Sequence, residues 1–93
     1  MMAKLSPDDI GRRMRGLQGW TLSGDAIHKQ FTCAGFPEAV QFVNRLVPEV
    51  EAANHHPDVR ILYNRVTLTY STHSEGGLTE KDFIGAAMAD RLA

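Results

Sequence analysis

The feature that most constrains the fold is a strict alternation between residues 66 and 71. Apolar side chains and small hydroxyl side chains take turns there: Val66, Thr67, Leu68, Thr69, Tyr70 and Ser71. An alternation with a period of two predicts a β-strand that has one face in a core and the other in water. Strands of this kind belong to antiparallel sheets, so we expect helices to cover only one face of the sheet.

Two hairpins are expected to provide the strands of this sheet. Four short segments rich in β-branched and aromatic residues predict strands at 20–23, 26–31, 59–63 and 66–70. Gly24-Asp25 lies between the first two segments and is a two-residue turn with glycine first. Asn64-Arg65 is the expected turn of the second hairpin.

Helices are predicted before, between and after the hairpins. The first has Ser6 as its N-cap, Pro7 at its first position and Gly16 at its end. The second is long, from about Pro37 to Ala53, and Pro48 is expected to kink it because proline removes a backbone hydrogen bond. Apolar residues recur along this long helix at the helical period: Phe36, Ala39, Val40, Val43, Val47 and Val50.

The last helix completes the predicted fold. Thr79 and Asp82 have the spacing of a helix cap, and the expected apolar face that follows consists of Ile84, Ala87, Met88 and Leu92. The order helix, hairpin, helix, hairpin, helix predicts an α+β fold, a four-stranded antiparallel sheet with three helices packed on one face. With 93 residues, the chain is expected to form a single domain over 1–93.

Composition argues against several classes of partner and site. A net charge of −1 provides no field that would attract nucleic acid or an anionic membrane, and we expect neither as a partner. Cys33 is the one cysteine, so an internal disulfide is excluded and a reducing compartment is favoured. The first ten residues lack the apolar stretch of a signal peptide, and the expected location is the cytoplasm.

Three of the four histidines stand where they could meet. His55 and His56 precede Pro57 at the exit of the long helix, and His73 follows the fourth predicted strand. The start of the third strand and the end of the fourth are neighbours across their hairpin, so these side chains can line one cleft. Imidazoles give and take protons near neutral pH, which makes acid–base catalysis the functional interpretation.

Other interpretations of the same residues stay open at this point. A lone histidine is usually structural or exposed, and His28 is expected to face solvent from its strand. A zinc site needs three or four ligands at distinctive spacing, and neither a helical histidine pair nor a cysteine pair is present, so we expect no metal. Thr79 and Asp82 can also be a helix cap and nothing more.

The sequence resembles the pterin-4a-carbinolamine dehydratase family, also known as the dimerization cofactor of a homeodomain transcription factor. The stretches that carry the resemblance are Glu51-Ala-Ala-Asn-His-His-Pro57, Tyr63-Asn-Arg-Val66, Leu68-Thr-Tyr-Ser-Thr-His73 and Gly77-Leu-Thr-Glu-Lys-Asp82. The family pattern places an acidic residue before His-His-Pro, then an aromatic residue, a histidine and an aspartate. Glu51, Pro57, Tyr63, His73 and Asp82 meet this pattern at every step.

The resemblance implies loss of water from a 4a-hydroxytetrahydropterin in tetrahydrobiopterin recycling, without metal or other cofactor. His55 and His73 are then the expected acid–base pair, and His56 orients the pterin or stabilises charge. Asp82 and Glu51 are expected to orient a histidine and favour its charged form. The remaining pocket residues are expected to be Asn54, Ser71, Thr72 and Ser74.

The same resemblance implies partners and leaves two rival functions. A homodimer that extends the sheet, or a homotetramer of such dimers, is expected, and an aromatic amino acid hydroxylase acts in the same pathway. One rival is a non-catalytic dimerisation or coactivator module. The other is an enzyme acting on a different pterin, such as one in molybdenum cofactor metabolism.

Overall fold

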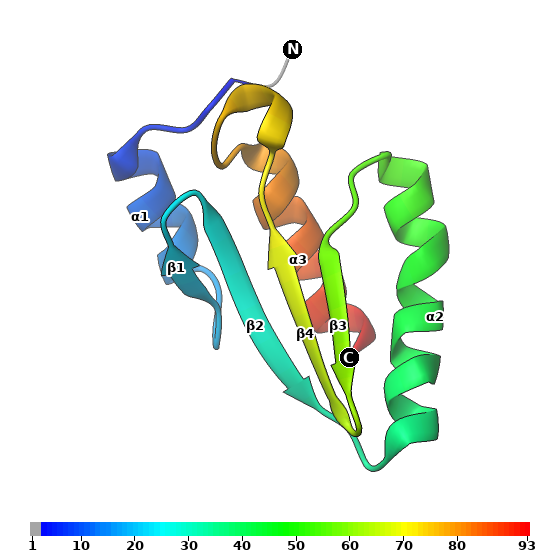
Figure 1. Cartoon of the computed structure of the whole chain (residues 1–93). Coiled ribbons are helices and arrows are strands. Elements are labelled where there is room, and N and C mark those ends of the chain that lie inside the picture. The colour runs from blue at the N-terminus through cyan, green and yellow to red at the C-terminus, as the bar shows by residue number, and fades with distance from the viewer. Residues whose placement is uncertain (1–2) are drawn as a thin grey trace.

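A computed structural model describes residues 3–93, and its elements follow the predicted order (Figure 1). The helices and strands are α1 (Pro7–Arg15), β1 (Thr21–Ser23), β2 (Ala26–Thr32), α2 (Phe36–Ala53), β3 (Asp58–Leu62), β4 (Arg65–Tyr70), a short 3₁₀ helix η1 (His73–Glu75) and α3 (Glu80–Leu92). The four strands form one sheet in the order β1-β2-β4-β3, and every pair is antiparallel. The predicted α+β fold is confirmed.

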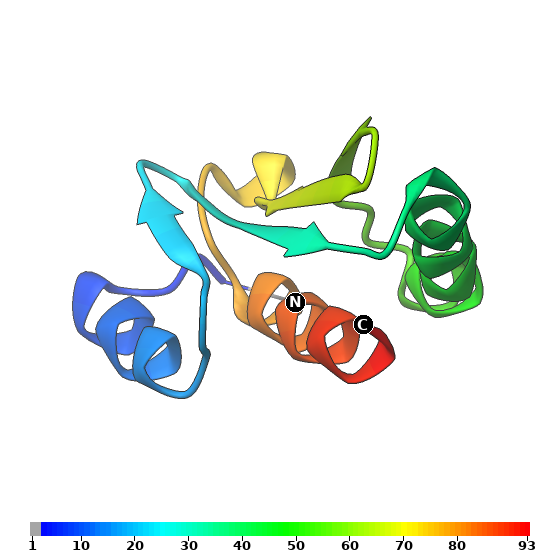
Figure 2. The same ribbon diagram turned by 90° about the horizontal axis from the view of Figure 1, so that it is seen from below.

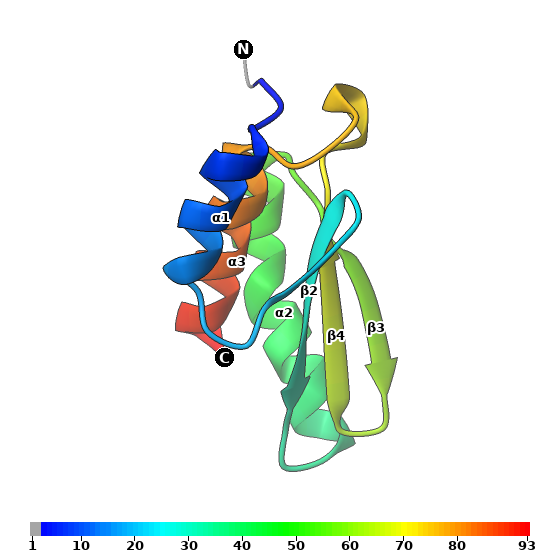
Figure 3. The ribbon, with the colours of Figure 1, turned by 90° about the vertical axis from the view of Figure 1, so that its left-hand side faces the viewer.

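The three helices lie on one side of the sheet and leave the other side open (Figures 2 and 3). On β4, Val66, Leu68 and Tyr70 are buried beneath the helices, whereas Thr67 and Thr69 between them belong to the open face. The alternation in the sequence therefore sets which face is covered. Within residues 3–93 no helix is long and apolar enough to cross a membrane.

Two helix starts form as their residues predict. The Ser6 side chain accepts a hydrogen bond from the Asp9 amide, and Gly16 caps the end of α1. At α3, Thr79 and Asp82 form a reciprocal capping box. The Thr79 hydroxyl accepts the Lys81 N–H, and the Asp82 carboxylate accepts the Thr79 N–H. The predicted two-residue turn at Gly24-Asp25 is also present, since Ser23 pairs with Ala26.

The long helix buries a stripe that agrees with the predicted one only in part, at Ala39 and Val50. Phe36 is 52% exposed and Val47 is also exposed, while Ala39, Phe42, Leu46 and Val50 are buried. Two overlapping stripes that share Ala39 and Val50 both fit the helical period, and the stripe with the larger side chains Phe42 and Leu46 removes more apolar area from water. The helix runs from Phe36 to Ala53 with Pro48 inside it.

The last helix is also rotated relative to the expectation. Ile84, assigned to the apolar face, is 61% exposed, and the buried apolar residues are Phe83, Ala86, Met88 and Ala89. The small side chains of Ala86 and Ala89 allow α3 to lie close to the sheet, and this close packing decides its orientation.

The turn of the second hairpin lies one residue earlier than predicted. Leu62 pairs with Arg65, so the turn residues are Tyr63 and Asn64, and Tyr63 has a positive φ of 53°. Asn64 fixes this position, because its side-chain amide donates to the Cys33 carbonyl over 3.0 Å and its own carbonyl accepts the Cys33 N–H over 2.7 Å. A contact with a segment 31 residues away in the chain thus sets the turn.

Candidate active site

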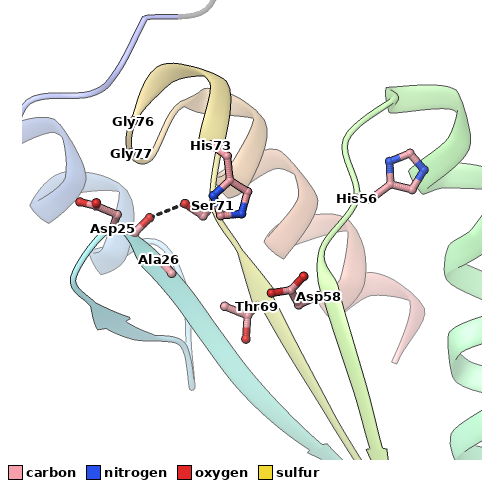
Figure 4. Close-up of a pocket in the computed structure, with 9 residues that line it drawn as sticks. All are labelled: Asp25, Ala26, His56, Asp58, Thr69, Ser71, His73, Gly76 and Gly77. Carbon is pink, nitrogen blue, oxygen red and sulfur yellow. Dashed lines mark hydrogen bonds between the residues drawn. The ribbon is translucent and has the colours of Figure 1, made fainter.

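A cavity of about 330 Å³ opens on the uncovered face of the sheet, near the start of β2 and the end of β4 (Figure 4). Its lining combines polar side chains with two glycines: Asp25, Ala26, His56, Asp58, Thr69, Ser71, His73, Gly76 and Gly77. Strand register explains part of this set, since Asp58 of β3 pairs with Thr69 of β4. Residues that face the open side of paired strands therefore meet in the cavity.

The chain after β4 carries His73 to the cavity. Ser71 Oγ donates to the Asp25 carbonyl over 2.7 Å, which ties the end of β4 to the first hairpin. Thr72 then bridges to Gly77, and the turn between them closes through η1 with Gly76 at a φ of 73°. His73 lies in this small loop, exposed and beside the cavity (Figure 4).

His55 lies on the helix side of the same end of the sheet. Asn54 adopts the left-handed conformation and ends α2, so the chain turns immediately before the histidine. The side chain of His55 is 13% exposed, and its Nε2 lies 2.6 Å from Asp82 Oδ1. Its ring stacks on Tyr70 with 5.6 Å between centroids. It lines a groove of about 210 Å³ that also contains Tyr70, distinct from the open-face cavity.

Asp82, the partner of His55, is fully buried in the first turn of α3. Its Oδ2 accepts the Thr79 backbone N–H over 2.9 Å and the Thr72 hydroxyl over 2.8 Å. Burial, and next the nearby Asp82 charge, raise the pKa of Tyr70 to about 12. The carboxylate thus connects the loop after β4, the cap of α3 and the imidazole of His55.

His56 has a carboxylate partner of its own. Its Nε2 lies 2.5 Å from Glu51 Oε2, one helical turn back in α2. The His56 side chain is 55% exposed, so water competes with this contact, and we expect it to hold the ring weakly compared with the buried contact of His55. His56 also lines the open-face cavity.

The predicted site residues lie in the open-face cavity, on the helix side of the sheet, or outside both. His56, Ser71 and His73 line the open-face cavity. His55 and Asp82 meet on the helix side, and Thr72 is turned inward to Asp82 rather than lining the cavity. Asn54 serves as the C-cap of α2, and Ser74 lies exposed in η1 outside the cavity lining.

Six cavity residues escaped the sequence analysis, and three of them have polar side chains: Asp25, Asp58 and Thr69. Thr69 stands on the polar side of the alternation in β4, and Asp58 directly follows His-His-Pro, so both carried a local signal. Asp25 carried none, because only the packing of the first hairpin against Ser71 brings it near. Within residues 3–93, no group of three or more His, Cys, Asp or Glu side chains is arranged to hold a metal ion.

Comparisons with known proteins agree along the whole chain. The family described as "Pterin 4 alpha carbinolamine dehydratase" matches residues 3–92. A protein of Thermosynechococcus vestitus named "Putative pterin-4-alpha-carbinolamine dehydratase" is 44% identical over 93 residues, which cover 100% of this chain and 98% of that protein. One of Roseiflexus castenholzii with the same name is 46% identical over 92 residues, which cover 99% of both chains.

Solved structures show the same fold. The transcriptional coactivator/pterin dehydratase from Brucella melitensis superposes with a TM-score of 0.93 at 33% identity, covering 97% of this chain and 98% of that one. A pterin dehydratase-like RuBisCO assembly factor of the alpha-carboxysome gives a TM-score of 0.64 at 21% identity over 80% of this chain and 86% of that one, which is a likeness of fold alone. On the family match and the close relatives together, the chain belongs to the pterin-4a-carbinolamine dehydratase family.

Proposed function

We propose that this protein dehydrates a 4a-hydroxytetrahydropterin to the quinonoid dihydropterin and so supports the recycling of tetrahydrobiopterin. The observation that carries the proposal is that His56 and His73 line the open-face cavity while His55, held by Asp82, lies on the helix side of the same end of the sheet. Extending the register of Asp58 with Thr69 brings the loop of His55 and His56 beside residues 71 and 72. Three imidazoles therefore gather around the end of β4.

The reaction needs two proton transfers and nothing else. Hydroxide is a poor leaving group, so an acid protonates the 4a-oxygen as the C4a–O bond breaks and water departs. A base takes the N5 proton, and the N–H electron pair becomes the C4a=N5 double bond. One proton is donated and one is accepted, the C4a–O electron pair departs with the water, and no oxidant or reductant is consumed, so the balance needs no metal, nucleotide or redox cofactor.

We assign the two transfers to His55 and His73. Asp82 supports this role for His55, because a buried carboxylate fixes the ring and stabilises the imidazolium that forms during turnover. His56 is more exposed and its carboxylate partner Glu51 is a surface residue, which suits a role in orienting the pterin. Ser71 offers a hydroxyl at the cavity wall.

The deciding experiment is a dehydration assay with chemically generated 4a-hydroxytetrahydropterin, followed by the absorbance of the quinonoid product. We expect the protein to accelerate the spontaneous reaction. Folded protein that gives no acceleration at any concentration would refute the proposal. The same assay with other 4a-hydroxypterins tests the alternative that the natural substrate is a different pterin.

We also propose a homodimer that extends the sheet, or a homotetramer of such dimers, acting in the cytoplasm beside an aromatic amino acid hydroxylase. Edge strand β3 supports this, because Val59 and Leu62 are exposed on it and Val59 lines one groove with the exposed Val47 of α2. The relative from Brucella melitensis bears a coactivator name as well as an enzyme name, which keeps a binding role as the second candidate function. Association without dehydration would favour that role.

A further inference from the structure

The hydrogen bonds around Asp82 have only one consistent direction. Oδ2 of this buried carboxylate accepts from the Thr79 backbone N–H and from Thr72 Oγ1. Thr72 has a single hydroxyl proton, and an ionised carboxylate only accepts, so that proton points to Asp82. In the 2.8 Å contact between the two hydroxyls, Thr79 must then be the donor. Thr79 Oγ1 in turn accepts from the Lys81 N–H.

We infer that this chain of hydrogen bonds places the proton of neutral His55 on Nε2, makes Nδ1 the nitrogen that exchanges protons, and makes Thr72 a positioning residue. Oδ1 lies 2.6 Å from Nε2, and since the carboxylate only accepts, Nε2 must carry a hydrogen. A neutral imidazole has one N–H, so its lone pair lies on Nδ1. Within residues 3–93, no hydrogen bond to a protein atom occupies Nδ1. The consequence for catalysis rests on the proposed function, whereas the tautomer does not.

The network also dictates how an amide at position 82 would be oriented. In Asp82→Asn, Thr72 and the Thr79 N–H still require an acceptor where Oδ2 now lies, so the amide oxygen takes that place. The NH₂ group must then face His55 Nε2, which can accept its hydrogen bond only without a proton. The proton moves to Nδ1, and the variant carries the opposite tautomer with nearly the same shape.

Nitrogen NMR of protein labelled with ¹⁵N-histidine measures the tautomer directly, at a pH where the imidazoles are neutral. The His55 signals are assigned by their loss in His55→Gln. We expect Nε2–H in the wild type and Nδ1–H in Asp82→Asn. In the double variant Thr72→Val/Asp82→Asn, one of the two groups that orient the amide is gone, and a mixture is expected. Thr72→Ser/Asp82→Asn keeps the hydroxyl and should restore Nδ1–H.

A matched control and the wild-type spectrum keep the inference falsifiable. Thr67→Val removes a threonine hydroxyl from the open face of β4, outside the cavity lining, and should leave the tautomer unchanged. A wild-type protein with its proton on Nδ1, or an Asp82→Asn protein that retains it on Nε2, overturns the inference. If Asp82→Asn does not fold, the wild-type spectrum still decides the tautomer.

Kinetics separate this inference from the proposed function. With the wrong tautomer, kcat of Asp82→Asn should fall by about 10²–10⁴-fold with little change in KM. Thr72→Val should lower kcat by a smaller factor that Thr72→Ser recovers. An inactive wild type with the expected tautomers would refute dehydration and leave the tautomer assignment standing. An active wild type whose Asp82→Asn variant has inverted the tautomer at full kcat would refute the role of Nδ1.

Discussion

Gly85 of α3 is the position where one added methyl group should cost most. A Cβ built on Gly85 would lie 2.5 Å from Tyr70 Cζ, 2.6 Å from Cε1 and 2.8 Å from the hydroxyl oxygen. Tyr70 is 1% exposed, so its rigid ring has no solvent to move into. The same ring stacks on His55 and therefore links this packing contact to the candidate site.

Two opposing effects set the magnitude for Gly85→Ala. Alanine is the better helix former, which alone would stabilise α3 by about 1 kcal/mol. Carbon atoms pack at about 3.5–4.0 Å, so the ring and the helix must separate by roughly 1 Å. Overpacking of this size typically costs about 1–3 kcal/mol, and the large overlap places the variant near the upper end. We expect a net loss of about 1–2 kcal/mol in the free energy of unfolding.

Urea denaturation measures this loss, and the chain contains a matched control. Gly11 is also helical, but its added Cβ would meet only Arg15 Nη1, at 3.9 Å. Gly11→Ala should therefore stabilise the protein by up to about 1 kcal/mol, the opposite sign. Both variants must be compared at one protein concentration, because self-association would shift apparent stability. A Gly85→Ala protein as stable as the wild type would refute the reasoning about close approach.

The remaining predictions concern catalysis, titration and assembly. His73→Ala should lower the dehydration rate by about 10²–10⁴-fold while His28→Ala, outside the cavity, is nearly silent, and equal rates in folded protein would contradict the assignment. Dehydration should persist after exhaustive chelation, and activity that returned only with zinc would contradict acid–base catalysis alone. The Tyr70 pKa rises from 10.0 to about 12 on folding. The contribution of Tyr70 to the free energy of unfolding is therefore fully present below pH 10 and is lost as the pH rises through 12. Tyr70→Phe should remove this alkaline loss of at most about 3 kcal/mol in denaturation measured against pH. Sedimentation at micromolar concentration should show a dimer or tetramer, and a 10.3 kDa species alone would refute self-association.

The parts of the fold that could be predicted are those set by neighbours in the chain. The strands, the two-residue turn at Gly24 and the capping box of α3 depend on residues within a few positions of one another. Helix orientation depends on distant partners, which is why the sequence pattern predicts Ile84 on the apolar face although α3 buries Phe83 instead. The turn of the second hairpin lies one residue earlier than predicted for the same reason, because Asn64 is hydrogen-bonded to Cys33 in another loop.

The candidate site shows the same division. The spacing of the histidines placed them at one end of the sheet, since a hairpin fixes which residues are neighbours. Adjacent residues point their side chains in different directions, but the sequence could not say which histidine faces the open side, because that follows from the helix cap at Asn54. Thr72 looked like a pocket residue by its position beside His73, and only the fold turns it inward to Asp82.

Asp82 shows why a structural and a functional interpretation of one residue need not compete. Its Oδ2 completes the cap of α3, and its Oδ1 is left for His55. Truncation to alanine would remove both contacts, costing about 1 kcal/mol for the cap and about 1–3 kcal/mol for the Thr72 hydroxyl left without its acceptor. A loss of activity in Asp82→Ala would therefore mix unfolding with a catalytic defect. Asp82→Asn keeps an acceptor for Thr72 and Thr79 and changes only what His55 meets, so it isolates the oxygen that faces the imidazole.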